Sequence, residues 1–140
     1  MIDLLSGIHS TSAALTAERT RLDVISENIA NANITRGADG KPYQRQIVVF
    51  EAALQKAMHG GSSSPTLRVA NIQKDPRPFE IVHQPGHRDA DADGNVAMPN
   101  VNIHEEMADL IAASRAFEAN LAVVRNARTM AMQTLAIGKR

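Results

Sequence analysis

An apolar repeat of seven residues runs through both ends of the chain and is absent from its middle. Near the N-terminus it places Leu15, Leu22 and Ile29 seven residues apart, and near the C-terminus it places Leu121 and Leu135 two repeats apart. A seven-residue repeat makes a narrow apolar stripe along a helix, and such a stripe needs another helix to cover it. The two ends are therefore predicted to be long helices that assemble with copies or relatives of the same chain.

The two stripes define the expected assembly interface. Large apolar side chains fill most of its positions, and two asparagines lie beside it at the end of the first helix. The predicted interface residues are Leu4, Ile8, Leu15, Leu22, Ile25, Asn28, Ile29, Asn31, Ile103, Met107, Leu110, Phe117, Leu121, Val124 and Leu135.

Local signals set the ends of the two helices. The first is predicted from Asp3 to about Ala32, roughly 45 Å at ~1.5 Å per residue, which is long for a small globule. The second is predicted to begin after Asn102, an N-cap with Glu105 placed to reach back to it, and to end at Gly138. The fold class expected is mainly α, with the long terminal helices pairing as a coiled coil.

The middle of the chain is predicted to be small, β-rich and loop-rich. Tyr43 and the β-branched run that follows it favour a strand, and prolines and glycines break up the rest. The elements expected are a strand over 43–50, a helical turn over 51–58, a Gly-Ser break over 60–65 and short strands over 66–73 and 79–84. The chain thus divides into an N-terminal axial helix (residues 1–33), a middle segment (34–101) and a C-terminal axial helix (102–140).

Composition excludes several classes of protein. The 15 basic residues balance the 15 acidic ones, and no basic tract offers a surface for nucleic acid. The chain has no cysteine, no tryptophan and only three phenylalanines, so a self-sufficient globular core is not expected. No stretch is long and apolar enough for a membrane span, and the N-terminus lacks the pattern of a cleaved secretory signal.

Two groups of residues could bind a metal but lack the rest of a site. Asp89, Asp91 and Asp93 open like a calcium loop, but its twelfth position, which normally holds a bidentate Glu, is Asn100. His83 and a second histidine four residues later are separated by a Pro-Gly pair, which prevents a shared helical face. We expect a polar turn at the aspartates, and no catalytic, cofactor or metal site in the chain, because no nucleophile or phosphate-binding motif occurs either.

Asparagines gather unusually at the end of the first predicted helix. The segment SENIANAN, residues 26–33, contains three of them although Asn is a poor helix former. Either the helix frays there with Asn33 as its cap, or the amides bond to neighbouring chains in a packed assembly. We expect such bonds from Asn28 or Asn31.

These residues resemble a known family. SENIANAN is similar to the N-terminal signature of the axial proteins of the bacterial flagellum, and ASRAFEANLAVVRNARTM, residues 113–130, is similar to their C-terminal helix. Between them, PGHRDADADGNVAMPNVNIHEEM and GADGKPY, followed by VVFEA, resemble the proximal rod proteins of the basal body. The Gly-Ser loop within residues 55–66 follows no family pattern.

The resemblance implies a structural subunit without a cofactor. Proteins of this family are exported by the flagellar type III apparatus without a cleaved signal and polymerise in the periplasm into the rod. Their terminal helices form an inner tube and their middle segments an outer layer. The implied partners are copies of this chain, other rod proteins and the export apparatus.

Two other interpretations stay open at this point. One is a soluble calcium-binding or coiled-coil adaptor module, based on the aspartate loop and the helical ends. The other is a small hydrolase, which no residue pattern supports. Calcium titration followed by circular dichroism separates the first from a rod subunit, since only a calcium module should gain structure.

Overall fold

The computed structural model describes the backbone of residues 2–54 and 65–138, and the side chains of residues 7–52 and 66–138. The side chain of Leu4, a predicted interface residue, lies outside this part of the chain. So does most of the loop in which the Gly-Ser break was expected.

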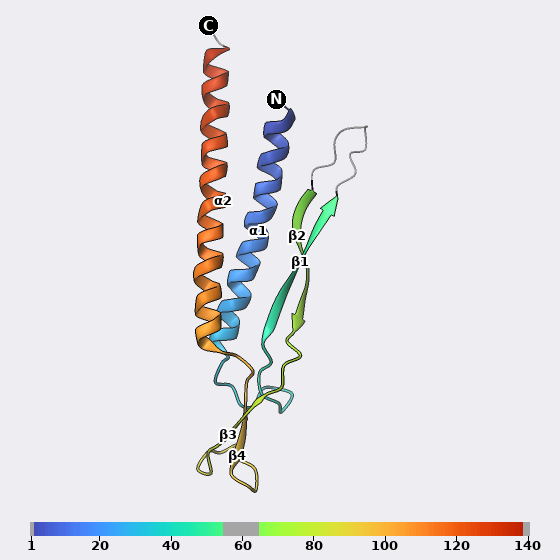
Figure 1. The fold of residues 1–140 in the computed structure, drawn as a ribbon, viewed down its shortest axis with the longest axis vertical. Helices are drawn as coiled ribbons and strands as arrows, with labels where there is room; N and C mark the ends of the chain where they lie inside the picture. The colour runs from blue at the N-terminus through green and yellow to red at the C-terminus, as the bar shows by residue number, and fades with distance from the viewer. Residues whose placement is uncertain (1, 55–64, 139–140) are drawn as a thin grey trace.

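Two long antiparallel helices dominate the molecule (Figure 1). Helix α1 spans Ile2–Ala30 and helix α2 spans Ile103–Ile137. Because the helices lie side by side and run in opposite directions, both chain ends lie at one end of the molecule. The predicted architecture of two long terminal helices around a small strand-containing middle is confirmed. Neither helix has an apolar stretch that could span a membrane, within the residues searched.

The start of α2 follows its predicted cap. The Asn102 side chain accepts hydrogen bonds from the backbone N–H groups of His104, at 3.0 Å, and Glu105, at 3.4 Å. The predicted contact of the Glu105 side chain with Asn102 is wrong, because the Glu105 carboxylate accepts a hydrogen bond from Arg77 instead. At the other end Gly138 follows the helix as predicted.

The first hairpin lies along α1. Strand β1, Gln46–Leu54, pairs antiparallel with β2, Pro65–Lys74, with a register shift between Val49 and Phe50. The helical turn expected over 51–58 is wrong over residues 51–54, which continue β1, and the remainder lies outside the described residues. Pairing with β2 overrides the helix-favouring alanines of this segment.

The second hairpin lies at the end of the molecule away from the chain termini (Figure 1). Strand β3, Glu80–His83, pairs antiparallel with β4, Asn95–Met98, which sequence reasoning missed. Gly94 closes the connecting turn with a φ of +76°, a conformation that favours glycine.

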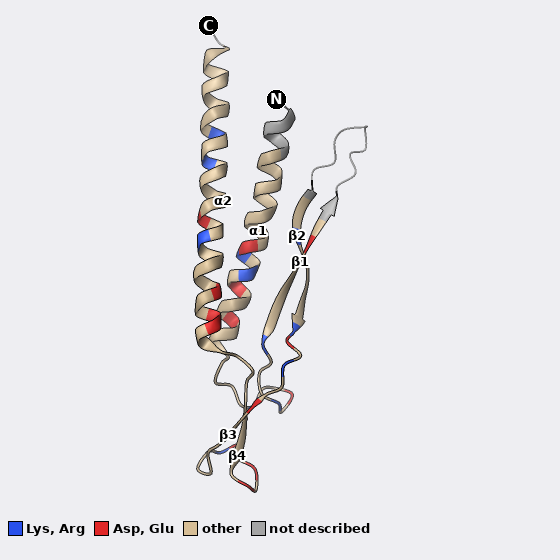
Figure 2. Cartoon of the chain, in the orientation of Figure 1, with Lys and Arg blue, Asp and Glu red and all other residues tan. Residues whose placement is uncertain are grey.

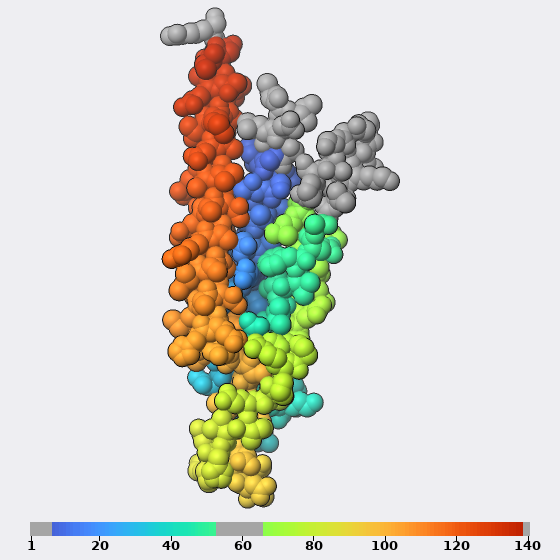
Figure 3. Space-filling model, in the orientation of Figure 1, coloured from blue at the N-terminus to red at the C-terminus, as the bar shows by residue number. Residues whose placement is uncertain are grey.

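The buried core is thin and made of small side chains. Helix α1 lies between α2 and the first hairpin and is covered on two sides, as the space-filling view shows (Figure 3). Its most buried apolar residues are Ala17, Val24 and Ile25, and those of α2 are Ala113 and Ala127. Large apolar side chains of α2 stay exposed instead, namely Ile103, Met107, Ile111, Val123, Met130, Met132, Leu135 and Ile137.

Candidate assembly surface and polar waist

The contact between the helices uses a row of α2 residues that differs from the predicted row by one position. Glu106, Ala113 and Ala127 fall on one seven-residue repeat and are buried. The predicted row through Met107, Leu121 and Leu135 lies beside it. Alanine allows the two helix backbones to approach closely, so this row, and not the bulkier one, faces the inside of the molecule.

The bulkier row is therefore left at the surface of the single chain. Met107 is 52% exposed and Leu135 is 62% exposed, Ile103 is also exposed, and Leu121 is half-buried. The remaining predicted α2 positions, Leu110, Phe117 and Val124, are half-buried. The exposed members of the row are free to contact another chain, so their predicted role in assembly stays a prediction.

The predicted α1 stripe is partly covered by the chain itself. Ile8, Leu15, Leu22 and Ile29 are half-buried, and Ile25 is buried. Since the first hairpin and α2 both pack on α1, less of its apolar surface than predicted remains for neighbours.

The described side chains nearest the chain termini on both helices are uncharged (Figure 2). Residues 7–17 of α1 and 129–137 of α2 contain no Asp, Glu, Lys or Arg. Between these ends lies an open apolar groove of about 360 Å³, lined in part by Ile8, Val124 and Met130. A neighbouring helix could cover this surface without burying an unpaired charge, which would be costly.

The opposite end of the helix pair holds a buried amide with all of its hydrogen bonds satisfied. Asn28 is 1% exposed and donates to the Gln46 carbonyl, at 2.9 Å, and to Glu106, at 3.1 Å. Its oxygen accepts from the Gln46 N–H and the Tyr43 hydroxyl, each at 2.9 Å. An Asn amide has two N–H hydrogens and one oxygen with two lone pairs, so this set uses all of them.

These bonds bear on the expectation that Asn28 or Asn31 bonds to a neighbouring chain in the assembly, which stays a prediction. No donor or lone pair of Asn28 is left for the neighbouring chain to which it was predicted to bond. Its partners belong to its own chain, on α2 and at the start of β1. The Asn31 amide, just past the end of α1, donates to the Glu27 carbonyl, at 2.8 Å, so any bond from its oxygen to another chain stays a prediction.

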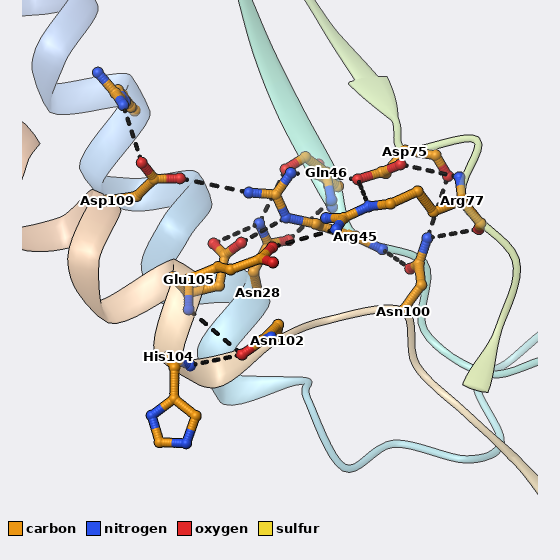
Figure 4. Close-up of polar contacts among 12 residues, drawn as sticks. Asn28, Arg45, Gln46, Asp75, Arg77, Asn100, Asn102, His104, Glu105 and Asp109 are labelled. Atoms are coloured by element: carbon orange, nitrogen blue, oxygen red, sulfur yellow. Dashed lines mark hydrogen bonds and ion pairs between the residues drawn. The ribbon is translucent and has the colours of Figure 1, made fainter. Parts of the chain in front are cut away.

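Arg45 connects α2 with the segment that follows β2 (Figure 4). Its Nε lies 2.5 Å from a Glu106 oxygen, its Nη1 lies 3.3 Å from Asp75, and its Nη2 lies 3.5 Å from Asp109. The side chains of Arg45, Asp75 and Glu106 are all largely buried. Burial opposes the charge on Arg45, but the bonds to Glu106 and Asp75 outweigh it and raise the pKa of the guanidinium.

A second set of contacts extends from Asp75. Its carboxylate accepts from the Arg77 backbone N–H, at 2.9 Å, and from the Arg77 guanidinium, at 2.8 Å, which also reaches Glu105. Burial alone would raise the pKa of Asp75, but these bonds and Arg45 hold it below its usual range.

We call this network the waist and define it as Asn28, Arg45, Asp75, Arg77, Asn100, Glu105 and Glu106.

The aspartates that resembled a calcium loop face other partners. Asp89 accepts from the Thr35 hydroxyl, at 2.8 Å, and lies 3.5 Å from Arg36, and these contacts lower its pKa. Asp91 accepts from the backbone N–H groups of Asp93 and Asn95, as in a polar turn. Among the described residues, no three His, Cys, Asp or Glu side chains are placed to hold a metal ion.

The waist was missed by sequence reasoning. Arg45 and Glu106 are 61 residues apart, and neither belongs to a local motif. A weak signal was present, since Glu106 continues the seven-residue spacing of Ala113 and Ala127 but is charged. A charged residue in a row that is otherwise buried indicates a partner elsewhere in the chain.

Two family models match the parts of the chain that form the helices. One, described as "Flagella basal body rod protein", matches residues 9–38. The other, described as "Flagellar basal body rod FlgEFG protein C-terminal", matches residues 92–137. The first match includes α1 from residue 9 onward, the second includes all of α2, and each extends into the middle segment.

Curated relatives match nearly the whole chain. The flagellar basal-body rod protein FlgC of Borreliella burgdorferi is 42% identical, with 96% of this chain and 97% of the relative covered. The protein of the same name from Yersinia enterocolitica is 40% identical over 99% of this chain and 100% of the relative. The one from Bacillus subtilis is 35% identical over 96% of this chain and 100% of the relative.

Proposed function

Because this chain belongs to the FlgC family of flagellar basal-body rod proteins and is a structural subunit of that rod, we propose that it polymerises through α1 and α2. Its place is the proximal part of the rod, in the periplasm, where the rod transmits torque from the motor to the hook. Its neighbours there are copies of itself and other rod proteins. It reaches the rod through the flagellar type III export apparatus, without a cleaved signal.

One observation carries this proposal: α2 exposes large apolar side chains toward its C-terminal end and has no charged residue over 129–137. Met132, Leu135 and Ile137 are each more than half exposed in the single chain. Isolated exposed apolar residues are ordinary, but several of them together on an uncharged stretch of helix indicate a surface that binds another protein. The work is mechanical, and no enzymatic activity is proposed.

A substitution at Leu135 tests the proposal against a matched control. Leu135→Asp places a charge where a neighbouring subunit should pack, and because Leu135 is exposed in the single chain, the change should leave the fold of the subunit intact. Gln133→Asp adds the same charge two residues away, at another exposed position. Each variant is expressed in cells that lack the native copy.

We expect Leu135→Asp to be exported but to leave few complete rods in electron micrographs of isolated basal bodies, and to abolish swimming. Gln133→Asp should support rods and swimming close to wild type. Normal rods with Leu135→Asp would show that this row of α2 is not an assembly surface.

A further inference from the structure

The lower hairpin, β3 with β4, is attached to the rest of the molecule at two places: the waist, and the contacts of Asp89, in its connecting turn, with Thr35 and Arg36 after α1. Within the described residues, neither strand packs on α1, α2 or the first hairpin. Two chain segments lead between the two parts, at about residues 75–79 and 99–102, and the segment that joins α1 to β1 passes beside them (Figure 1). Two parts joined by a small interface are expected to move relative to each other.

The waist opposes that motion because it joins these segments to one another. The Arg45 backbone N–H donates to the Asn100 side chain, and the Arg45 carbonyl accepts from the Asp75 N–H, each at 2.8 Å. The Asn100 amide donates in turn to the Arg77 carbonyl, at 2.8 Å. Both connections to the lower hairpin are therefore hydrogen-bonded to each other and to the segment that precedes β1.

The Arg45 side chain then ties these segments to α2. Its carboxylate partner Glu106 is 0% exposed, and among the described residues the only other side chain bonded to that carboxylate is Asn28, on α1. Figure 4 shows the guanidinium between the carboxylates of α2 and Asp75. Without it, Glu106 would be a buried charge with no cation beside it, which is strongly destabilising. The cost of this buried charge would fall if water reached Glu106, and water can reach it only if the segments separate.

We propose that Arg45 is a positioning residue that makes the waist stiff, so that the helix pair and the lower hairpin move as one rigid body. A load applied to the lower hairpin then reaches the helices directly. When the guanidinium is removed, the same joint becomes a hinge, while the helix pair and the first hairpin keep their own packing.

Spin-label distances in the purified full-length chain test this directly, since the sequence contains no cysteine. One label pair crosses the waist, at Ala112→Cys on α2 and Ile81→Cys on β3. The other pair stays on one side of it, at Ala112→Cys and Ala70→Cys on β2. All three positions are exposed.

Double electron–electron resonance is recorded for each pair in the wild-type background, in Arg45→Met and in Arg68→Met. The last variant is a control that breaks an ion pair with Glu51 outside the waist.

We expect one narrow distance peak for both pairs in the wild-type and Arg68→Met backgrounds. In Arg45→Met the narrow peak should be lost for the pair that crosses the waist and kept for the other. Three results would overturn the proposal: a broad wild-type distribution across the waist, a narrow one in Arg45→Met, or loss of both peaks in Arg45→Met, which would mean that Arg45 supports the whole fold. These readouts need no assembled rod, so they are independent of the proposed role of Leu135.

Discussion

Asn28 on α1 and Asn31 just beyond the end of α1 lie three residues apart but have very different surroundings. Asn28 is buried and bonds to groups on α2 and β1, whereas Asn31 is half-buried and its amide donates to the Glu27 carbonyl of the preceding turn. The same residue type therefore joins three elements at one position and satisfies a local carbonyl at the other. Burial and partners, not the sequence motif they share, decide what each contributes.

Replacing Asn28 should therefore cost far more stability than replacing Asn31. Asn28→Leu keeps a similar volume but leaves buried partners of the amide unsatisfied, at about 1–3 kcal/mol each. Asn31→Leu removes one bond within a helix turn and should change the free energy of unfolding little. Thermal unfolding followed by circular dichroism measures both, and equal losses for the two variants would contradict the role assigned to Asn28.

Asp75 makes the stability of the folded subunit depend on pH in the acidic range. Its pKa is lowered in the folded state, so its carboxylate stabilises the fold above the unfolded pKa, and that stabilisation is lost as the pH falls through the folded pKa. Unfolding measured from neutral pH to below about pH 4 should show this loss. Asp75→Asn should flatten this part of the profile, while Asp93→Asn, at an exposed turn position, should leave it as steep as in wild type.

At the scale of elements, small residues determine how the two helices pair. Ala113 and Ala127 lie on the buried row of α2, and Ala17 is buried on α1. The larger residues of the neighbouring row are left outside. The helices therefore pair closely along a narrow seam and keep a second apolar row for other contacts.

This pairing predicts a sharp difference between two adjacent alanines. Ala113 is 0% exposed, so Ala113→Leu should overpack the seam and destabilise the subunit by about 1–3 kcal/mol. Ala112 is exposed, and Ala112→Leu should be close to neutral. Chemical denaturation of both variants gives the comparison, and similar midpoints would mean that α1 does not pack on this row.

The elements themselves could largely be predicted from the sequence because their signals are local. The apolar repeat and the Asn102 cap predicted both helices, and the β-branched run from Ile47 predicted β1. Strand β4 was missed because its four residues, starting at Asn95, are too few to show an alternating pattern. The buried α2 row was missed because alanine gives a weaker apolar signal than the leucines beside it.

The waist could not be predicted because its contacts join distant residues. Arg45 meets Asp75 and Glu106 across 30 and 61 positions, and an isolated arginine in a turn-rich segment is ordinarily a solvated side chain. Only the folded chain places these charges together. The same is true of Asn28, whose motif was recognised but whose partners were assigned to another chain.

At the scale of the whole molecule, polar and apolar contacts are separated along its length. Several charged side chains at and near the waist form ion pairs within the chain, whereas the described stretches of the helices nearest the termini, residues 7–17 and 129–137, carry none (Figure 2). The waist thus holds the subunit together, and the uncharged ends are left for neighbours. A subunit built in this way suits a rod that must resist shear.

A high-resolution cryo-electron microscopy map of basal bodies isolated from cells that carry this protein tests the central claim most directly. The account predicts α1 and α2 in the wall of the rod, with Ala113 still packed on its own α1. It also predicts that Met107 and Leu135, exposed in the single chain, are covered by neighbouring subunits. A rod in which this chain is absent, or in which both side chains face open solvent, would contradict it.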